Sequence, residues 1–186
     1  MKKQPLRVGL DLDGVLLYNP ARIARPIIVL FKKIFFPKEK YTFHYPADKL
    51  QQTVWLFLHR TSIWPAGGLN DIKKLIVNKN IEVYIISARY EFLKSDFKSW
   101  QKKIDPDNLF TGWFYNDTNE QPHFFKEKMI KKLKIDVFVE DNWDIVKYLT
   151  AQKLAAKIFW IYNIFDRNIR YPNKFPTLKK ALAKLR

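Results

Sequence analysis

Short apolar runs alternate with helical patterns along most of this chain of 186 residues, and that alternation limits the folds open to it. Runs rich in β-branched and aromatic side chains are typical of buried strands. Such runs occupy residues 7–12, 82–86, 136–139, 157–162 and, more weakly, 112–115. Helical patterns lie at residues 70–78, 92–103, 125–133 and 143–152. Strands that alternate with helices favour an α/β fold with a parallel sheet.

Residues 18–66 interrupt this alternation. They contain aromatic residues, prolines and helical pieces but no convincing strand pattern. We therefore predict a core formed by residues 1–17 and 67–186, with residues 18–66 as a small helical cap inserted after the first strand. Ligands of parallel α/β sheets bind at the carboxyl ends of the strands. A cap over that edge could exclude water and select what binds there.

The absence of cysteine narrows the class of protein further. It excludes disulfides and cysteine-bound zinc, and it is compatible with the reducing cytoplasm, where we expect the protein to be located. Asp11 interrupts the apolar run of the basic N-terminus too early for a signal peptide. No stretch of 18 apolar residues is present, so we expect no transmembrane segment.

Basic residues strongly outnumber acidic ones, and the formal net charge is +16. Residues 147–186 carry ten Lys or Arg and a single acidic residue, so this stretch accounts for +9. Such a balance favours nucleic acid or an anionic surface as partner, but it is also typical of a solvated, lysine-rich face. Residues 22–36 are apolar and basic, and could lie on a membrane surface or pack as a helix on their own domain. The sequence does not indicate an oligomeric state.

The first predicted strand ends in Asp11-Leu12-Asp13-Gly14. Carboxylates are costly to place at the end of a buried strand unless a cation or a reaction uses them. Asp11 and Asp13 would face the same way in an extended chain, and a helical or looser turn after Asp11 would instead aim both at one point. Such a pair could hold Mg²⁺, and one of them could attack phosphorus. The same four residues could also form a turn without chemistry.

Polar groups also accompany the later strands. Residues 87–89, Ser-Ala-Arg, follow the strand at 82–86, and residues 140–142, Glu-Asp-Asn, follow the strand at 136–139. The helix before the latter strand carries Lys126 and Lys128. Because the carboxyl ends of parallel strands share one edge of a sheet, these groups are candidates for one site.

These four groups, in this order, resemble the motifs of the haloacid dehalogenase-like (HAD) phosphohydrolase superfamily. The matching stretches are DLDGVL, IISAR, FFKEKMIKKLKID and VFVEDN, and the resemblance covers about residues 6–165. WPAGGLNDIKKL and KIFWIYNIFDRNIR further resemble the small 5'-nucleotidase-like group. The resemblance implies a three-layer Rossmann-like fold with a central parallel sheet.

The resemblance also implies the roles of the acidic residues. Asp11 would be the nucleophile that forms an aspartyl-phosphate. Asp13 would protonate the leaving oxygen and then deprotonate the attacking water. Asp11, the Asp13 carbonyl and Asp141 would hold Mg²⁺. Glu140 would act through water or orient these ligands.

Phosphate contacts are implied in the same way. The Ser87 hydroxyl and nearby backbone N–H groups, including that of Ala88, would bind phosphoryl oxygens. Lys126 would neutralise charge on the transferring group. Lys128 is the alternative, because a slip of two residues in the loop would exchange the two lysines. Ser87 could also be the N-cap of the following helix.

Several other residues have two interpretations each. Arg89 could clamp an anionic substrate with two hydrogen bonds, or it could pair with Asp96 or Glu91. Asn142 could orient Asp141 or cap the following helix. Some side chains of the predicted cap could contact a substrate or stack on a base, or could simply pack the cap: His44, Tyr45, Trp55, His59 and Trp64. The three histidines, His123 included, do not form a spaced metal set.

The favoured function is that of a Mg²⁺-dependent phosphatase. It would hydrolyse a phosphate monoester, either a nucleotide or another small phosphorylated compound. One alternative is a protein of the same scaffold that binds nucleic acid or an anionic surface, and another is a phosphatase that acts on nucleic-acid ends. Transfer to an acceptor other than water is also open, because its first half-reaction would be the same.

Overall fold

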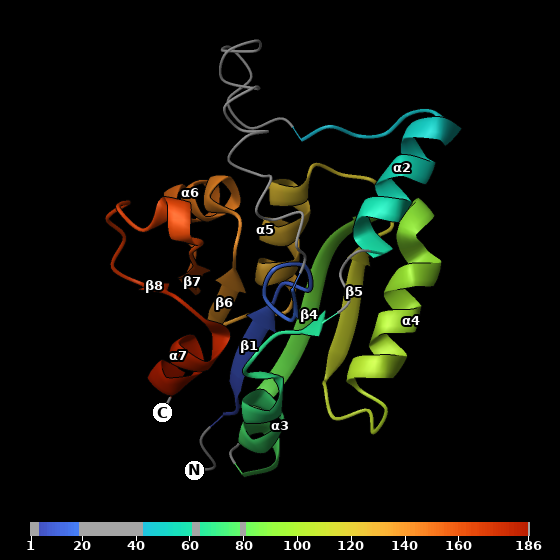
Figure 1. Ribbon diagram of the computed structural model, residues 1–186. Coiled ribbons are helices and arrows are strands. Elements are labelled where there is room, and N and C mark those ends of the chain that lie inside the picture. Colours follow the sequence, from blue (N-terminus) through green and yellow to red (C-terminus); the bar gives the residue numbers. More distant parts are fainter. Residues whose placement is uncertain (1–3, 19–42, 61–63, 79–80, 186) are drawn as a thin grey trace.

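Six parallel strands form the central sheet of the computed structural model, which describes residues 4–18, 43–60, 64–78 and 81–185 (Figure 1). The strands lie in the order β5-β4-β1-β6-β7-β8. Their bounds are Leu6–Leu10 (β1), Ile81–Tyr90 (β4), Gly112–Asn116 (β5), Val137–Glu140 (β6), Lys157–Ile161 (β7) and Lys174–Phe175 (β8). All neighbours in this sheet pair in parallel, as the alternation of strands and helices predicts.

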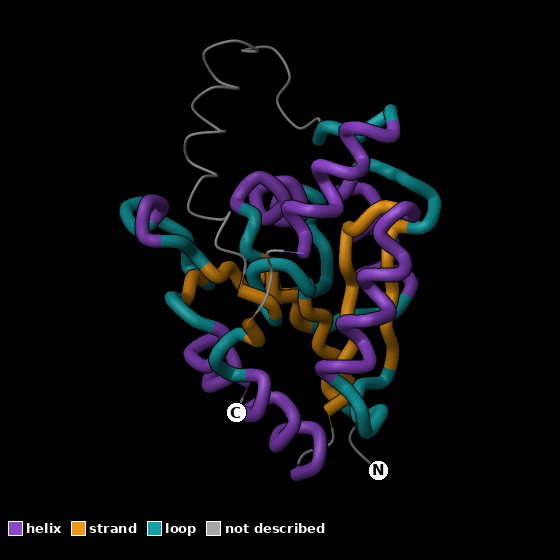
Figure 2. Tube along the Cα trace, turned by 45° about the vertical axis from the view of Figure 1, so that its right-hand side comes forward, coloured by secondary structure: helices purple, strands orange, loops and turns teal. Residues whose placement is uncertain are grey.

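Helices cover both faces of the sheet (Figure 1 and Figure 2). One face packs against α3 (Leu69–Asn78), α4 (Lys94–Ile104) and α7 (Leu178–Leu182). The other packs against α5 (Pro122–Lys132) and α6 (Trp143–Ala151). The predicted three-layer α/β architecture is therefore confirmed.

Alternation along the strands assigns each side chain to one of the two layers. Val137 and Val139 belong to the apolar cluster beneath α3, α4 and α7, whereas Phe138 between them belongs to the cluster beneath α5 and α6. All three are buried. Burial on both faces explains why these strands are continuous apolar runs in the sequence.

One strand is longer than its sequence pattern indicates. The predicted strand at 82–86 extends as β4 to Tyr90, because its last part pairs with β5 through Ser87 and Tyr115 and through Tyr90 and Asn116. The alternative that Ser87 caps a helix is therefore wrong. A 3-10 turn at Glu91–Leu93 follows the strand, and α4 begins only at Lys94.

Part of the predicted cap is described. It contains α2 (Lys49–Arg60) and a two-stranded antiparallel ribbon of β2 (Leu17–Tyr18) and β3 (Trp64–Pro65). The apolar, basic stretch 22–36 lies outside the described residues, and so do 61–63. The cap boundary at 18–66 stays a prediction. Among the described helices, none is long and apolar enough to cross a membrane.

Candidate active site

A tight turn directly after β1 places the first acidic motif at the carboxyl edge of the sheet. The Asp11 N–H donates to the Val139 carbonyl at 3.0 Å, which ties the start of the turn to β6. The N–H groups of Leu16 and Leu17 both donate to the Leu12 carbonyl, so the chain turns in a helical manner. The Asp11 side chain is only 7% exposed. This turn, rather than an extended chain, governs where the carboxylates point.

A buried lysine lies between two buried carboxylates at this edge. Lys126 Nζ is 3.0 Å from Asp11 Oδ2 and 2.6 Å from Glu140 Oε2. Lys126 comes from the buried face of α5, together with Met129 and Ile130. Lys128 lies on the exposed side of the same helix, where its Nζ pairs with Glu120 at 2.7 Å. The structure thus brings Lys126, and not Lys128, to the candidate site.

Helical periodicity was the signal that could have separated the two lysines. Pro122, Lys126, Met129 and Ile130 recur at the three- and four-residue spacings of one helix face. Lys128 falls outside that set.

The end of β6 contributes two further acidic side chains. Asp11, Glu140 and Asp141 each offer a carboxylate oxygen, and these oxygens lie within 4.8 Å of one another. The other oxygen of Glu140, Oε1, accepts hydrogen bonds from the backbone N–H groups of Asp141 and Asn142. Among the residues that the structure describes, this is the one group of three or more potential metal ligands. Hard carboxylate oxygens suit Mg²⁺.

Two neighbouring groups hold the loop after β6 in place. The Trp160 indole N–H donates to the Asp141 carbonyl at 3.1 Å. The Asn142 side chain accepts from the Asp144 N–H at 3.0 Å and caps α6, which agrees with the capping interpretation of this residue. Glu140 is fully buried and bonded through both oxygens, so it is suited to orient its neighbours.

The cluster of Asp11, Glu140 and Asp141 has three carboxyl groups, and Lys126 is the cation that pairs with Asp11 and Glu140. Burial raises the pKa of Asp11 well above its usual range, and the nearby carboxylates of Glu140 and Asp141 add to this rise, although Lys126 opposes it. Burial likewise raises the pKa of Glu140. A divalent cation next to Asp11 would reverse this balance and favour its ionised form. The donor set and its charge therefore fit Mg²⁺.

Ser87 and Ala88 lie at the carboxyl end of β4, which pairs directly with β1. Ser87 is buried, and its Oγ accepts a hydrogen bond from the Arg89 N–H at 3.3 Å. The two residues are thus on the strand next to the one that carries Asp11. Their predicted contact with phosphate stays a prediction.

Asp13 has a partner that the sequence does not reveal. Arg89 donates from Nε to Asp13 Oδ2 and from Nη2 to Asp13 Oδ1, both at 2.8 Å. Burial alone would raise the pKa of Asp13, but the Arg89 guanidinium outweighs it and holds this pKa well below its usual range. His59 of α2 approaches the same carboxylate, with its Nδ1 3.7 Å from Oδ1.

Two of the cap residues with two interpretations, Trp55 and His59, lie on α2, and His44 lies next to that helix. His44 and His59 each lie close to the Trp55 ring, with centroid distances of 6.1 and 6.4 Å. Tyr45 meets Tyr90, at the end of β4, edge to face at 5.0 Å. His123 instead packs on α5 against Phe124 and Tyr148. These contacts agree with a packing role for Tyr45 and Trp55, whereas Trp64 is exposed.

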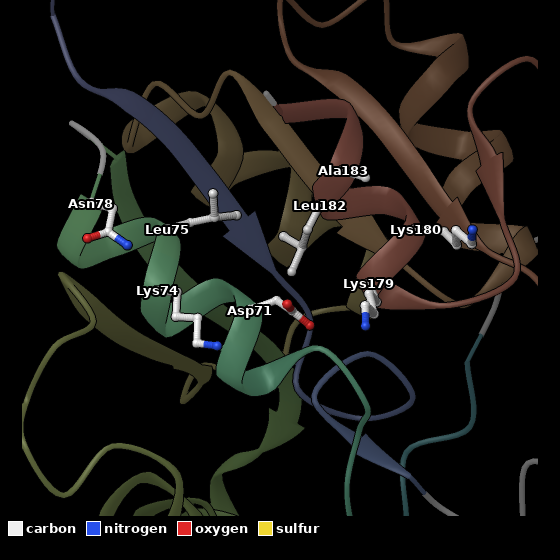
Figure 3. A pocket seen from close by; sticks show the side chains of 8 residues that line it. All are labelled: Asp71, Lys74, Leu75, Asn78, Lys179, Lys180, Leu182 and Ala183. Carbon is white, nitrogen blue, oxygen red and sulfur yellow. The ribbon is translucent and has the colours of Figure 1, made fainter.

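A pocket of about 450 Å³ lies elsewhere, between α3 and α7 (Figure 3). It is lined by Asp71, Lys74, Leu75, Asn78, Lys179, Lys180, Leu182 and Ala183. It shares no residue with the carboxylate cluster at the ends of β1 and β6. The candidate active site is therefore the cluster and not this pocket.

Comparisons with known proteins place the fold. No protein-family model and no curated protein matches the chain. Among solved structures, a CbbY variant from Rhodobacter sphaeroides in complex with xylulose-(1,5)bisphosphate has a TM-score of 0.61 at 9% identity, over 95% of this chain and 96% of that one. The HAD hydrolase YfnB from Bacillus subtilis, bound to magnesium, has a TM-score of 0.60 at 11% identity, over 98% and 99%.

A chain of the Pnkp1/Rnl/Hen1 RNA repair complex is a partial match. It has a TM-score of 0.49 at 15% identity, and the match covers 87% of this chain but only 44% of that one. The protein therefore has the fold of the haloacid dehalogenase-like hydrolases, as its sequence motifs predict.

Proposed function

We propose that the protein is a HAD-type, Mg²⁺-dependent phosphatase that hydrolyses a phosphate monoester through an aspartyl-phosphate on Asp11. The observation that carries this proposal is the meeting of Asp11, Lys126, Glu140 and Asp141 at the ends of β1 and β6. A nucleophilic carboxylate, a buried cation and a set of acidic metal ligands are the groups that phosphoryl transfer through an aspartyl-phosphate uses.

Asp11 acts as the nucleophile. One of its carboxylate oxygens attacks phosphorus, an aspartyl-phosphate bond forms, and the bond between phosphorus and the leaving oxygen breaks. Water then attacks the phosphorus of the intermediate, and the bond to Asp11 breaks to release inorganic phosphate. The position of Asp11 next to Lys126 supports this role, because the lysine stabilises the ionised carboxylate.

Asp13 moves the proton. It gives a proton to the leaving oxygen in the first half-reaction and takes one from water in the second, so that the cycle closes. The Arg89 pair favours the carboxylate form of Asp13, which is the form that accepts the proton of water. The acid form that the first half-reaction needs is favoured only when an anionic phosphate ester binds, because the negative charge of the ester opposes the effect of the guanidinium on the pKa of Asp13. About a quarter of the Asp13 side chain is exposed, which leaves access for water and for a leaving group.

Lys126 neutralises negative charge on the transferring phosphoryl group. Its Nζ lies beside the Asp11 oxygen, whereas Lys128 is on the surface, so the first lysine is the better candidate. The Ser87 hydroxyl and the Ala88 N–H would hold phosphoryl oxygens from the neighbouring strand. These roles rest on the position of β4 beside β1 and on the sequence motif.

Mg²⁺ would be held by Asp11, Asp141 and the Asp13 carbonyl, with Glu140 orienting these ligands. When bound, it offsets negative charge on the phosphoryl oxygens. Support comes from the acidic donor set and from the raised pKa values of Asp11 and Glu140, which come mainly from burial and in part from the neighbouring carboxylates. The YfnB structure, which shares the fold, holds magnesium.

The proposal predicts phosphate release that depends on Mg²⁺. We expect turnover of an aryl phosphate and of at least one member of a nucleotide panel in Mg²⁺, and a loss of at least about 100-fold after chelation. Adding back Mg²⁺ in excess should restore the rate, and Ca²⁺ is the control cation. The panel also tests the resemblance to the 5'-nucleotidase-like group. A folded protein that releases no phosphate from any compound, or that is equally active in chelator, would contradict the proposal.

Gly14 provides a separate test of the metal ligands. Its φ is +84°, and a β-carbon there would lie 2.4 Å from Asp141 Oδ2. We expect Gly14→Ala to lower the unfolding free energy by roughly 1–3 kcal/mol, because an L side chain is strained at this φ. We also expect it to raise the Mg²⁺ concentration needed for half-maximal activity, because Asp141 must move.

Gly67→Ala is the matched control for this change. A β-carbon at Gly67 meets nothing within 4 Å. Urea denaturation and Mg²⁺ titration should show wild-type behaviour for Gly67→Ala and clear losses for Gly14→Ala. Equal behaviour of the two variants would mean that Asp141 does not hold the position assigned to it.

A further inference from the structure

Arg89 is fully engaged by two carboxylates. Its side chain is 1% exposed, so it lies beneath the surface of the site rather than at its mouth. Nε and Nη2 bind the two oxygens of Asp13, and Nη1 donates to Asp96 Oδ2. A guanidinium that already binds one carboxylate edge-on and a second at its far side offers no free edge to a substrate anion. The geometry argues against the interpretation of Arg89 as a substrate clamp.

The two parallel hydrogen bonds fix the plane of the Asp13 carboxylate. Asp13 sits in the tight turn after β1, which fixes its backbone but does not by itself fix the rotation of its carboxylate. Arg89 is on β4, the strand next to β1, in an irregular stretch between Ser87 and Tyr90, which both pair with β5. An edge-to-edge contact with a guanidinium anchored between these two paired residues therefore sets both the position and the rotation of the carboxylate.

Asp96 in turn fixes Arg89. It lies in the first turn of α4, and its side chain is 13% exposed. It neutralises the part of the guanidinium that faces away from Asp13. The arrangement is thus a chain of three side chains from the β1 loop, β4 and α4: Asp13, Arg89 and Asp96.

We propose that Arg89 is a positioning residue that aims Asp13 at the leaving group, and that Asp96 holds Arg89 in the orientation this requires. The inference rests on the proposed function, since Asp13 transfers a proton only if phosphate esters are hydrolysed. Proton transfer depends on a hydrogen-bond distance between donor and acceptor, so a rotated Asp13 loses this contribution. When Asp13 is rotated, kcat/KM should therefore fall most for substrates whose leaving group needs a proton.

The test compares two leaving groups in the full-length protein. An alkyl phosphate expels a strongly basic alkoxide that needs a proton, whereas p-nitrophenyl phosphate expels a weakly basic phenolate that does not. The ratio kcat/KM reports the first half-reaction for each substrate. For Arg89→Lys we expect kcat/KM to fall about 10- to 100-fold on the alkyl phosphate and less than about threefold on the aryl phosphate.

Arg89→Lys separates orientation from charge. Lysine keeps the positive charge but cannot bind both oxygens of Asp13 in one plane. Asp96→Asn is the second variant, because it leaves Arg89 and Asp13 in place and carries the test if Arg89→Lys does not fold. For Asp96→Asn we expect kcat/KM on the alkyl phosphate to fall about three- to tenfold, again with a smaller effect on the aryl phosphate.

Asp105→Asn is the matched control. Asp105 is a buried acidic residue just after the end of α4, and it accepts hydrogen bonds from the N–H groups of Leu109 and Phe110, far along the helix from Asp96. Asp105→Asn should lower the unfolding free energy without changing the ratio of kcat/KM on the alkyl phosphate to kcat/KM on the aryl phosphate.

The outcomes are distinct. Equal losses on both substrates with a raised KM would show that Arg89 binds substrate and would overturn the inference. A Lys variant that matches wild type on both substrates would overturn it as well, as would a wild type that hydrolyses the aryl phosphate but no alkyl phosphate. A folded wild type without activity on either substrate would instead refute the proposed function, and the inference with it.

Discussion

Asp11→Asn should abolish phosphate release while the fold survives. The amide has the shape of the carboxylate but cannot attack phosphorus, so we expect a loss on the order of 10⁴-fold or more in kcat. The unfolding free energy should not fall. Burial raises the pKa of Asp11, so its charged form is disfavoured in the folded protein, and Lys126 keeps Glu140 as its partner when Asp11 is replaced.

Asp136→Asn is the control for this change. Asp136 precedes β6, at the opposite end of that strand from Glu140, and accepts a hydrogen bond from the Arg7 N–H. The Asp136→Asn variant should release phosphate at the wild-type rate. Phosphate release and urea denaturation are measured for the wild type, Asp11→Asn and Asp136→Asn. An Asp11→Asn variant as active as Asp136→Asn would rule out Asp11 as the nucleophile.

Lys126→Met should lose both activity and stability. Removal of the cation takes away the group that neutralises the phosphoryl charge, which we expect to cost about 10²- to 10³-fold in kcat. It also leaves Asp11 and Glu140 buried and close together without their shared cation, at a cost of roughly 3–5 kcal/mol in unfolding free energy.

The stability loss should depend on pH. The pKa values of Asp11 and Glu140 are raised in the folded protein even with Lys126 present, and its removal raises them further. A carboxyl whose folded pKa is raised favours the folded state below the unfolded pKa, about 4, and loses that advantage as the pH rises. The deficit of Lys126→Met should therefore be smallest near pH 4 and largest at neutral pH.

Lys128→Met is the matched control, since both lysines lie on α5 and both contact a glutamate. The Lys128 side chain is 58% exposed, so its pair with Glu120 contributes at most about 1 kcal/mol. Urea denaturation across pH, together with phosphate release, should leave this variant near wild type. Similar losses in the two variants would contradict the assignment of Lys126.

The sheet could be predicted from the sequence because its strands are buried on both faces. Apolar runs mark β1, β4, β6 and β7 directly, and the weaker fifth run proved to be β5. β8 was missed, because a strand of two residues has no periodicity to detect. The end of β4 was missed for another reason: its pairing with β5 outweighs the local Ser-Ala-Arg pattern that indicated a helix start.

The candidate site was predictable as far as it depends on strand ends. Asp11 and Asp141 each follow a recognisable strand, and parallel strands bring such ends together. The partner of Asp13 was not predictable, because Arg89 is 76 residues away and had nearer acidic candidates in Glu91 and Asp96. The pairing with Asp96 was foreseen as one of the alternatives. The contact with Asp13 depends on the neighbouring positions of β1 and β4, which a local pattern does not contain.

Trapping the covalent intermediate tests most directly whether Asp11 is the nucleophile. Wild-type protein is mixed with a limiting amount of substrate and Mg²⁺, quenched in acid within the first turnover, digested and analysed by mass spectrometry. We expect one phosphoryl group on the peptide that contains Asp11, which disappears when the quench is delayed and is absent from Asp11→Asn. Turnover without any phosphorylated peptide, or with the phosphoryl group on a peptide that lacks Asp11, would contradict it.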